Sequence, residues 1–332
     1  MSDHDLNRNI SLELARCTEA AALMSSSWMG RGDKESADQA AVDAMRQFLN
    51  TIPMSAQVAI GEGEKDEAPM LYVGEQLGSA DAPVVDIAVD PVEGTRLVAQ
   101  GQPNALCVIA VAERGAFYKW QDIAYMEKIA VGPQAAGRID ITKSVTENLG
   151  NIADAKGMDV SDLTVVVLDR PRHKELIREA REAGSRIKLI TDGDVAGGLM
   201  ASMENTGVDV LMGIGGSPEA VITAAALKCA GGDMQCRLWP RNDDERKAVV
   251  AQGLDVSRVF TIDDLVKSDD VFFAATGITD GELLEGVKFI PGGAVTHSLV
   301  MRAVSGTIRY IHSTHRMAKV RGLRQGMTHP LK

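Results

Sequence analysis

The sequence predicts an α/β fold, with an α+β N-terminal half followed by a half in which strands and helices alternate. From residue 159 onward, strand-like runs such as 164–168 and 186–190 are separated by helical segments, which is typical of a parallel α/β layer. Polar, Gly-rich motifs follow several of these strands, and open α/β sheets place their ligands at that end. We therefore expect an N-terminal domain at 1–158, a C-terminal domain at 159–332, and a site in the cleft between them.

Composition excludes several classes of function. The 332 residues are 45% hydrophobic, which is enough for a sizeable core, and the formal net charge is −11. Such an acidic chain lacks the basic face that binding to nucleic acid or a membrane surface requires. The four cysteines form no C-x-x-C pair, so we expect free thiols in a reducing cytoplasm rather than disulfides or a zinc site. The N-terminus shows no signal-peptide pattern.

Acidic side chains gather in the N-terminal half. A helix is expected at 10–29, followed by a polar loop that contains Lys34. Ser36 with Gln39 three residues later is a capping-box pattern, and it would place Asp38 in the first turn of the next helix. Asp38 there is also consistent with ordinary stabilisation of the helix dipole.

A second acidic group follows the expected strand 58–60. Glu62, Glu64 and Asp66 would point the same way in an extended chain. Two carboxylates about 4 Å apart repel by roughly 4 kcal/mol at an effective dielectric of 20, so they must be either splayed into water or neutralised by cations. The glycines on either side of Glu62 favour a ligand that approaches the backbone closely.

The segment 84–96 is the most informative part of the chain. Apolar residues alternate along an expected strand that ends at about Asp90, because Pro91 cannot donate to a sheet. A helix after Gly94 would present the N–H groups of Gly94 and Thr95 to an anion. Since Asp90 and Glu93 would repel an anion unless a cation lay between them, the segment predicts a metal-and-phosphate site.

The C-terminal half repeats the pattern of strands that end in polar motifs. We expect a strand at 126–131 with Tyr125 at its start, and strands that lead into the motifs 169–173, 191–194 and 213–219. Ser217 is a good N-cap and Pro218 a good first residue for the last of the following helices. Glu219 would then lie in the first turn of that helix.

Several of these motifs together carry a family resemblance. The run D-P-V-E-G-T at 90–95 is similar to the D-P-[IL]-D-G-T signature of lithium-sensitive-type sugar and inositol phosphatases, with Glu93 in place of Asp. Together with G-R-G-D-K at 30–34, G-E-G-E-K-D-E-A-P-M-L-Y at 61–72 and G-I-G-G-S-P-E at 213–219, the sequence resembles class II fructose-1,6-bisphosphatases over nearly its whole length.

The resemblance implies a layered α-β-α-β-α sandwich and a soluble cytoplasmic enzyme of gluconeogenesis that forms a homo-oligomer, a dimer or a tetramer. It also implies Mg²⁺ or Mn²⁺ as cofactor, because all the implied ligands are hard oxygen donors. The implied metal ligands are Asp38, Glu62, Asp90, Glu93 and Glu219. The implied substrate-binding residues are Glu93, Gly94, Thr95, Tyr125, Arg170, Pro171, Arg172, Asp192, Gly193, Asp194 and Gly216.

The expected mechanism is metal-assisted hydrolysis of the 1-phosphate of fructose 1,6-bisphosphate. Arg172 would grip the second phosphate bidentately, and the two aspartates would suit sugar hydroxyls. Thr95 is placed either to relay a proton or to contact the phosphate. Lys34, Glu64 and Asp66 would orient the attacking water or bind an extra cation.

Three alternatives stay open at this point. The first is a nucleotide-binding oxidoreductase, because G-x-G-x-x-P at 213–218 follows a strand, although Glu219 would repel a pyrophosphate. The second is a dual fructose-1,6-/sedoheptulose-1,7-bisphosphatase of carbon fixation, which the motif D-R-P-R-H-K-E-L at 169–176 resembles. The third is a non-catalytic binding protein on the same scaffold.

Overall fold

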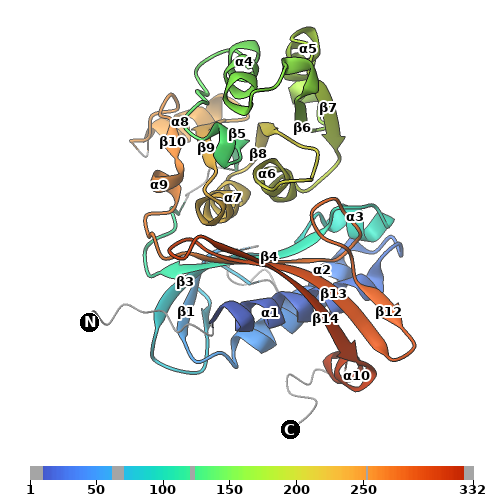
Figure 1. Ribbon diagram of the computed structural model, residues 1–332. Helices are drawn as coiled ribbons and strands as arrows, with labels where there is room; N and C mark the ends of the chain where they lie inside the picture. Colours follow the sequence, from blue (N-terminus) through green and yellow to red (C-terminus); the bar gives the residue numbers. More distant parts are fainter. Residues whose placement is uncertain (1–9, 62–70, 120–123, 252, 325–332) are drawn as a thin grey trace. The chain divides into compact units, whose positions relative to one another are not determined.

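The computed structural model describes residues 10–61, 71–119, 124–251 and 253–324 (Figure 1). The chain divides into two compact units, one formed by Met1–Phe117 with Asp270–Lys332 and the other by Tyr118–Asp269. These bounds differ from the expected boundary at residue 158. The strand β5 (Tyr125–Val131) pairs with strands of the second unit, whereas the last strands of the chain return to the sheet of the first.

The first unit contains an eight-stranded sheet in the order β12-β13-β11-β4-β3-β1-β2, with β14 paired to β13. Only β1 and β3 are parallel, and the other pairs described by the structure are antiparallel. The strands are β1 (Ser55–Ile60), β2 (Gln76–Leu77), β3 (Val84–Glu93), β4 (Leu106–Glu113), β11 (Phe272–Gly277), β12 (Lys288–Ile290), β13 (Gly293–Arg302) and β14 (Thr307–Arg316).

Two long helices pack together against this sheet (Figure 1). They are α1 (Ile10–Ser25), which a short 3₁₀ turn extends to Trp28, and α2 (Lys34–Leu49). The buried face of α1 is rich in alanine, which lets the helix approach α2 and the strands closely. The expected helix at 10–29 is thereby confirmed. The shorter helices of this unit are α3 (Thr95–Gln100) and α10 (Met317–Arg324).

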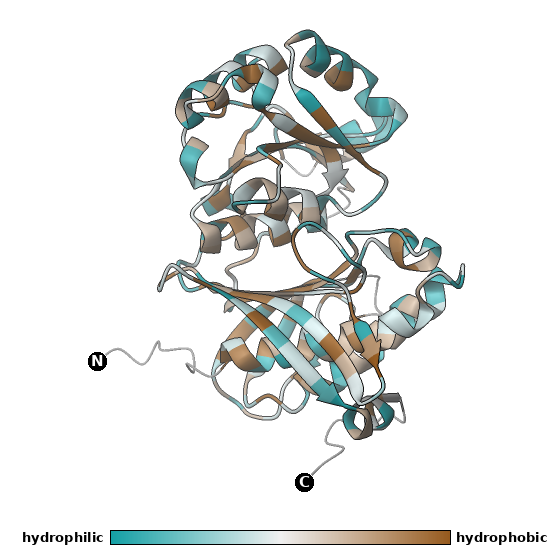
Figure 2. Cartoon of the chain, turned by 45° about the vertical axis from the view of Figure 1, so that its right-hand side comes forward, coloured by the Kyte–Doolittle hydropathy of each residue, from teal (hydrophilic) through white to brown (hydrophobic). Residues whose placement is uncertain are grey.

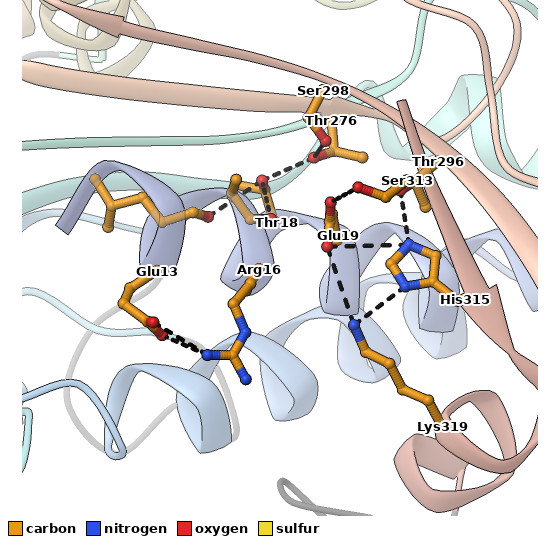
Figure 3. A network of polar contacts seen from close by, with 12 residues as sticks. Glu13, Arg16, Thr18, Glu19, Thr276, Thr296, Ser298, Ser313, His315 and Lys319 are labelled. Atoms are coloured by element: carbon orange, nitrogen blue, oxygen red, sulfur yellow. Dashed lines mark hydrogen bonds and ion pairs between the residues drawn. The ribbon is translucent and has the colours of Figure 1, made fainter. Parts of the chain in front are cut away.

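A buried polar network joins α1 to β13, β14 and α10 (Figure 3). Ser313 donates to Oε1 of Glu19 at 2.6 Å, and the His315 ring contacts the Thr296 hydroxyl at 2.8 Å and the Lys319 ammonium at 3.1 Å. Burial lowers the pKa of His315 to about 4, with a further contribution from Lys319, so the ring is neutral at pH 7. The polar side chains of this network therefore satisfy one another.

The second unit contains a six-stranded sheet in the order β10-β9-β5-β8-β6-β7. Its strands are β5, β6 (Thr164–Leu168), β7 (Arg186–Ile190), β8 (Val210–Gly216), β9 (Asp233–Leu238) and β10 (Phe260–Thr261). The expected parallel layer is confirmed only for β7, β6 and β8, because β5 and β9 run antiparallel to their neighbours.

Helices cover both faces of this second sheet (Figure 1). On one face α4 (Val145–Lys156) and α5 (Lys174–Glu182) bury a core that includes Leu149, Val165 and Val167. On the other face lie α6 (Asp194–Ser202) and α7 (Ser217–Ala230). Two further helices are α8 (Asp243–Ala251) and α9 (Ile262–Leu265). The α/β class predicted from the sequence is confirmed.

Hydropathy follows this layering (Figure 2). In each unit the strands carry hydrophobic segments, while the helices carry both hydrophilic and hydrophobic residues, as expected for elements with one buried face. Among the residues that the structure describes, no helix combines the length and the apolar character needed to cross a membrane.

Candidate active site

The junction between β3 and α3 holds two buried carboxylates. The strand continues past Pro91 to Glu93, three residues beyond the expected end, because the register against β4 shifts between Asp90 and Glu93. Such a bulge accommodates a proline that has no N–H to donate. Asp90 is 8% exposed and Glu93 is 3% exposed, and Oδ1 of Asp90 accepts a hydrogen bond from the Val92 amide at 3.0 Å.

Gly94 turns the chain from this strand into α3. Its φ of +90° lies in the left-handed region, and an added Cβ would lie 2.8 Å from Cδ1 of the buried Leu97. A residue with a side chain would therefore be both strained and crowded. Thr95 follows as the first residue of α3 and is half-buried, as the sequence predicts for this turn.

The helix that carries Asp38 begins earlier than expected. Its N-cap is Asp33, whose carboxylate accepts hydrogen bonds from the amide and the hydroxyl of Ser36 at 3.0 and 2.6 Å. The expected capping box at Ser36 is thus wrong, because Asp33 is the stronger acceptor and uses Ser36 as a donor. Lys34 becomes the exposed first residue, and Asp38 lies half-buried in the second turn.

The loop before this helix is fixed to α3. The amides of Gly30 and Gly32 donate to the carbonyls of Val98 and Ala99 at 2.9 and 2.8 Å. These bonds connect the start of the helix that bears Asp38 to the end of the helix that begins at Thr95.

The remaining acidic candidates of this unit, Glu62, Glu64 and Asp66, lie outside the described residues. Within the ranges that the structure describes, no three His, Cys, Asp or Glu side chains gather closely enough to form a metal site. The five-carboxylate ligand set therefore stays a prediction.

In the second unit, arginines surround the first residue of β5. Tyr125 pairs with Gly216 of β8, and the guanidinium carbons of Arg172 and Arg241 lie 5.2 and 5.6 Å from the centre of its ring. Arg172 also donates twice to the carbonyl of Ile214, at 3.2 and 2.7 Å. These contacts hold a positive charge beside the phenol ring, an arrangement that suits an anionic substrate group.

His173 is a structural residue of this region that sequence reasoning missed. Its Nδ1 lies 2.6 Å from the carbonyl of Leu168, and its Nε2 accepts a hydrogen bond from the amide of Ile214 at 2.7 Å. This pattern fits a neutral ring that carries its proton on Nδ1, and burial lowers the pKa of His173 in agreement. The ring thereby fixes the loop that carries Arg170, Pro171 and Arg172 to β8.

The other residues of the two substrate motifs lie close to this loop in the fold. Arg170 faces Asp192 at 3.8 Å between Nη2 and Oδ1. Gly193, with φ of +80°, is the N-cap of α6, and Asp194 is the first residue of that helix. Nζ of Lys128 on β5 lies 2.6 Å from Oδ2 of Asp194.

Glu219 lies in the first turn of α7, as expected. The N-cap is Gly216 rather than Ser217, because Ser217 is already the first residue of the helix. Burial raises the pKa of Glu219, and repulsion from Asp194 raises it further, while Lys128 lowers it.

Glu219 also shows a feature that fits a metal ligand. Its Oε2 is buried and has no hydrogen-bond partner among the described residues. A buried carboxylate oxygen without a donor is costly, and a divalent cation would satisfy it. The chemistry of the predicted ligands, all carboxylates, suits Mg²⁺ or Mn²⁺.

Comparison with known proteins extends these observations. Residues 8–315 match the family described as bacterial fructose-1,6-bisphosphatase, glpX-encoded. The chain is 46% identical over 323 residues to the fructose-1,6-bisphosphatase class 2 of Haemophilus influenzae (strain ATCC 51907 / DSM 11121 / KW20 / Rd), covering 93% of this chain and 97% of that protein. It is 45% identical over 335 residues to the D-fructose 1,6-bisphosphatase class 2/sedoheptulose 1,7-bisphosphatase of Synechococcus sp. (strain JA-3-3Ab), covering 93% and 96%.

Proposed function

The chain belongs to the class II fructose-1,6-bisphosphatase family, and from this premise we propose that it hydrolyses the 1-phosphate of fructose 1,6-bisphosphate in a metal-dependent reaction of gluconeogenesis. The β3–α3 junction carries the proposal. A bulge there buries the carboxylates of Asp90 and Glu93 just before Gly94 and Thr95, and hard oxygen donors beside the start of a helix suit a divalent cation that would in turn attract a phosphate.

The first unit supplies most of the proposed metal-binding groups. Asp38, Asp90 and Glu93, with Glu62 from the segment outside the described residues, would hold Mg²⁺ or Mn²⁺ together with Glu219. When bound, the metal supplies charge stabilisation at the phosphate and a more acidic water. Thr95, at the start of α3, contacts the phosphate or relays a proton through its hydroxyl. Lys34, Glu64 and Asp66 assist by orienting water or cations.

The second unit supplies the groups that would bind the rest of the substrate. Arg172 and Arg170 attract the 6-phosphate, and Tyr125 lies against the Arg172 guanidinium. Asp192 and Asp194 accept hydrogen bonds from sugar hydroxyls, and Gly193 and Gly216 complete the proposed set of substrate-binding residues.

Product analysis tests the proposal. Wild-type protein with Mg²⁺ or Mn²⁺ should release phosphate from fructose 1,6-bisphosphate and leave fructose 6-phosphate, and a chelator should stop the release. Formation of fructose 1-phosphate instead would contradict the assigned orientation of the substrate, and release that continues in excess chelator would contradict metal dependence.

A second candidate activity has a specific observation behind it. Two relatives from Synechococcus strains, 45% and 44% identical, carry names that include sedoheptulose 1,7-bisphosphatase. One additional sugar carbon is a matter of pocket size, so we propose the seven-carbon bisphosphate as an alternative substrate. A comparison of kcat/KM for the six-carbon and seven-carbon bisphosphates decides between a single and a dual activity.

A homo-oligomeric state is part of the same proposal, as a dimer or a tetramer. Light scattering coupled to size-exclusion chromatography should give a mass of two or four times the 35.4 kDa chain. A monomeric mass at the concentration of the activity assay would contradict it.

A further inference from the structure

The second unit contains a buried ion pair that none of the roles above explains. Lys128 lies in the middle of β5, and its Nζ is 2.6 Å from Oδ2 of Asp194. The two side chains are 1% and 7% exposed. Because removing two charges from water usually costs as much as their attraction returns, stability alone is a weak reason for such a pair.

Two glycines of β8 create the space for this pair. A Cβ on Gly215 would lie 1.7 Å from Oδ2 of Asp194 and 2.9 Å from Nζ of Lys128. A Cβ on the next residue, Gly216, would lie 1.9 Å from Oε2 of Glu219. The two glycines leave this part of β8 without side chains, and the charged side chains occupy that space. Lys128, Asp194 and Glu219 therefore form one compact group.

Lys128 is the source of positive charge in this group. Without it, Asp194 and Glu219 would be two neighbouring carboxylates in a largely buried environment, where repulsion is strong. With it, one oxygen of Asp194 is held by a short charge-assisted hydrogen bond, which fixes the plane of the carboxylate. Asp194 is also the first residue of α6, so its backbone is held by the helix as well.

We propose that Lys128 is a positioning residue, whose buried ammonium holds the Asp194 carboxylate in the orientation that binds the hydroxyls of the sugar substrate. This inference rests on the proposed function, which assigns Asp194 to the sugar. Lys128 acts through Asp194 and does not touch the reacting phosphate. Its loss should therefore weaken substrate binding more than it slows the chemical step.

Steady-state kinetics of Lys128→Met test this assignment. We expect KM for fructose 1,6-bisphosphate to rise by roughly 10- to 100-fold, the range for loss of a charge-assisted hydrogen bond, with a much smaller change in kcat. Asp194→Asn should raise KM similarly. The double variant Lys128→Met/Asp194→Asn, which removes both charges of the ion pair, should show no more than the larger of the two single effects, since the residues act as one unit.

Lys156→Met is a matched control in the same unit. It breaks the ion pair between Lys156 and Asp209, whose side chains are 17% and 12% exposed and which lies near the other end of β8. We expect a lower Tm with unchanged KM. If Lys128→Met also lowers Tm while KM stays at the wild-type value, the pair is only structural and the proposal is wrong.

A binding measurement without metal gives an independent readout. In excess chelator, fructose 6-phosphate should raise the Tm of the wild type and of Lys156→Met, and this shift should be lost in Lys128→Met and in the double variant. A full shift in the double variant would overturn the positioning role, even if the single variant fails to fold. Wild-type protein that releases no phosphate would instead contradict the proposed function, so the two failures are distinguishable.

Discussion

Glu93 shows how a single residue tests the assignment. It is 3% exposed at the end of a bulged strand, directly before Gly94 and Thr95. Replacing it with alanine should abolish phosphate release, because it removes a proposed metal ligand, while circular dichroism should still show a folded protein. Glu113→Ala, at an exposed position ending β4, is the matched control and should keep wild-type activity. Activity that survives Glu93→Ala would remove Glu93 from the metal site.

His315 predicts a pH dependence of stability. Burial lowers its pKa from 6.5 to about 4, so between these values the folded state binds fewer protons than the unfolded state. The free energy of unfolding should therefore fall as pH drops through this window, by about 3 kcal/mol from this group. Glu19, whose pKa is raised by burial, contributes with the opposite sign.

Urea unfolding from pH 7 to pH 4.5 measures this effect. His315→Gln should give a flatter dependence on pH than the wild type. His312→Gln, an exposed position on the same strand, should keep the wild-type slope. Equal slopes for His315→Gln and wild type would show that the buried ring does not set this dependence.

Among the elements, the turn from β3 into α3 depends most on one glycine. Gly94→Ala should lower the free energy of unfolding by about 1–3 kcal/mol, because φ is +90° and the new methyl group meets Leu97. Gly137 has a similar φ of +74°, but an added Cβ would have nothing within 4 Å. Gly137→Ala should therefore lower the free energy of unfolding only by the cost of the positive φ, about 1 kcal/mol. If Gly94→Ala lowers the free energy of unfolding no more than Gly137→Ala does, the new methyl group is not crowded by Leu97.

At the scale of elements, the sequence predicts local segments better than their ends. The strands at 164–168 and 186–190 match β6 and β7. The first is an almost wholly apolar run, and the second alternates basic with aliphatic residues, so both carry a local strand pattern. The predicted N-cap of α2, Ser36, is wrong, because Asp33 and Ser36 compete to cap the same turn and Asp33 is the residue that caps it. The strand β9 (Asp233–Leu238) was missed, although Met234, Cys236 and Leu238 alternate with polar residues and offered a signal.

For the candidate site, the sequence identifies the motif residues but not the residues that support them. His173 and Lys128 lie among ordinary strand and helix patterns, and their roles depend on partners 41 and 66 positions away along the chain. Pairings at such separations are set by the sheet order, which local periodicity does not reveal. The bulge at Pro91 is likewise not predictable from local sequence, because it depends on the register of β3 against β4.

For the whole molecule, the division into units depends on long-range pairing. The expected boundary at 158 follows a change in local pattern, whereas β11 and β13 return to pair beside β4 after the second unit is complete. The second unit is thus a continuous segment with its own core. We predict that a fragment of residues 118–269 folds on its own with a cooperative thermal transition and has no phosphatase activity.

Circular dichroism and a phosphate-release assay on this fragment check the prediction. A broad, non-cooperative transition would show that the second unit needs the first to fold. Hydrolysis of fructose 1,6-bisphosphate by the fragment alone would show that Asp38, Asp90 and Glu93 are dispensable.

We propose above all that this chain hydrolyses a sugar bisphosphate with divalent cations held by its carboxylates. A titration of Mn²⁺ against phosphate release, for the wild type and Glu219→Gln, tests it most directly. Glu219→Gln should remain folded and lose activity by roughly 100-fold at Mn²⁺ concentrations that saturate the wild type, because a buried ligand oxygen is replaced by an amide. Wild-type activity in Glu219→Gln at every Mn²⁺ concentration would contradict the account.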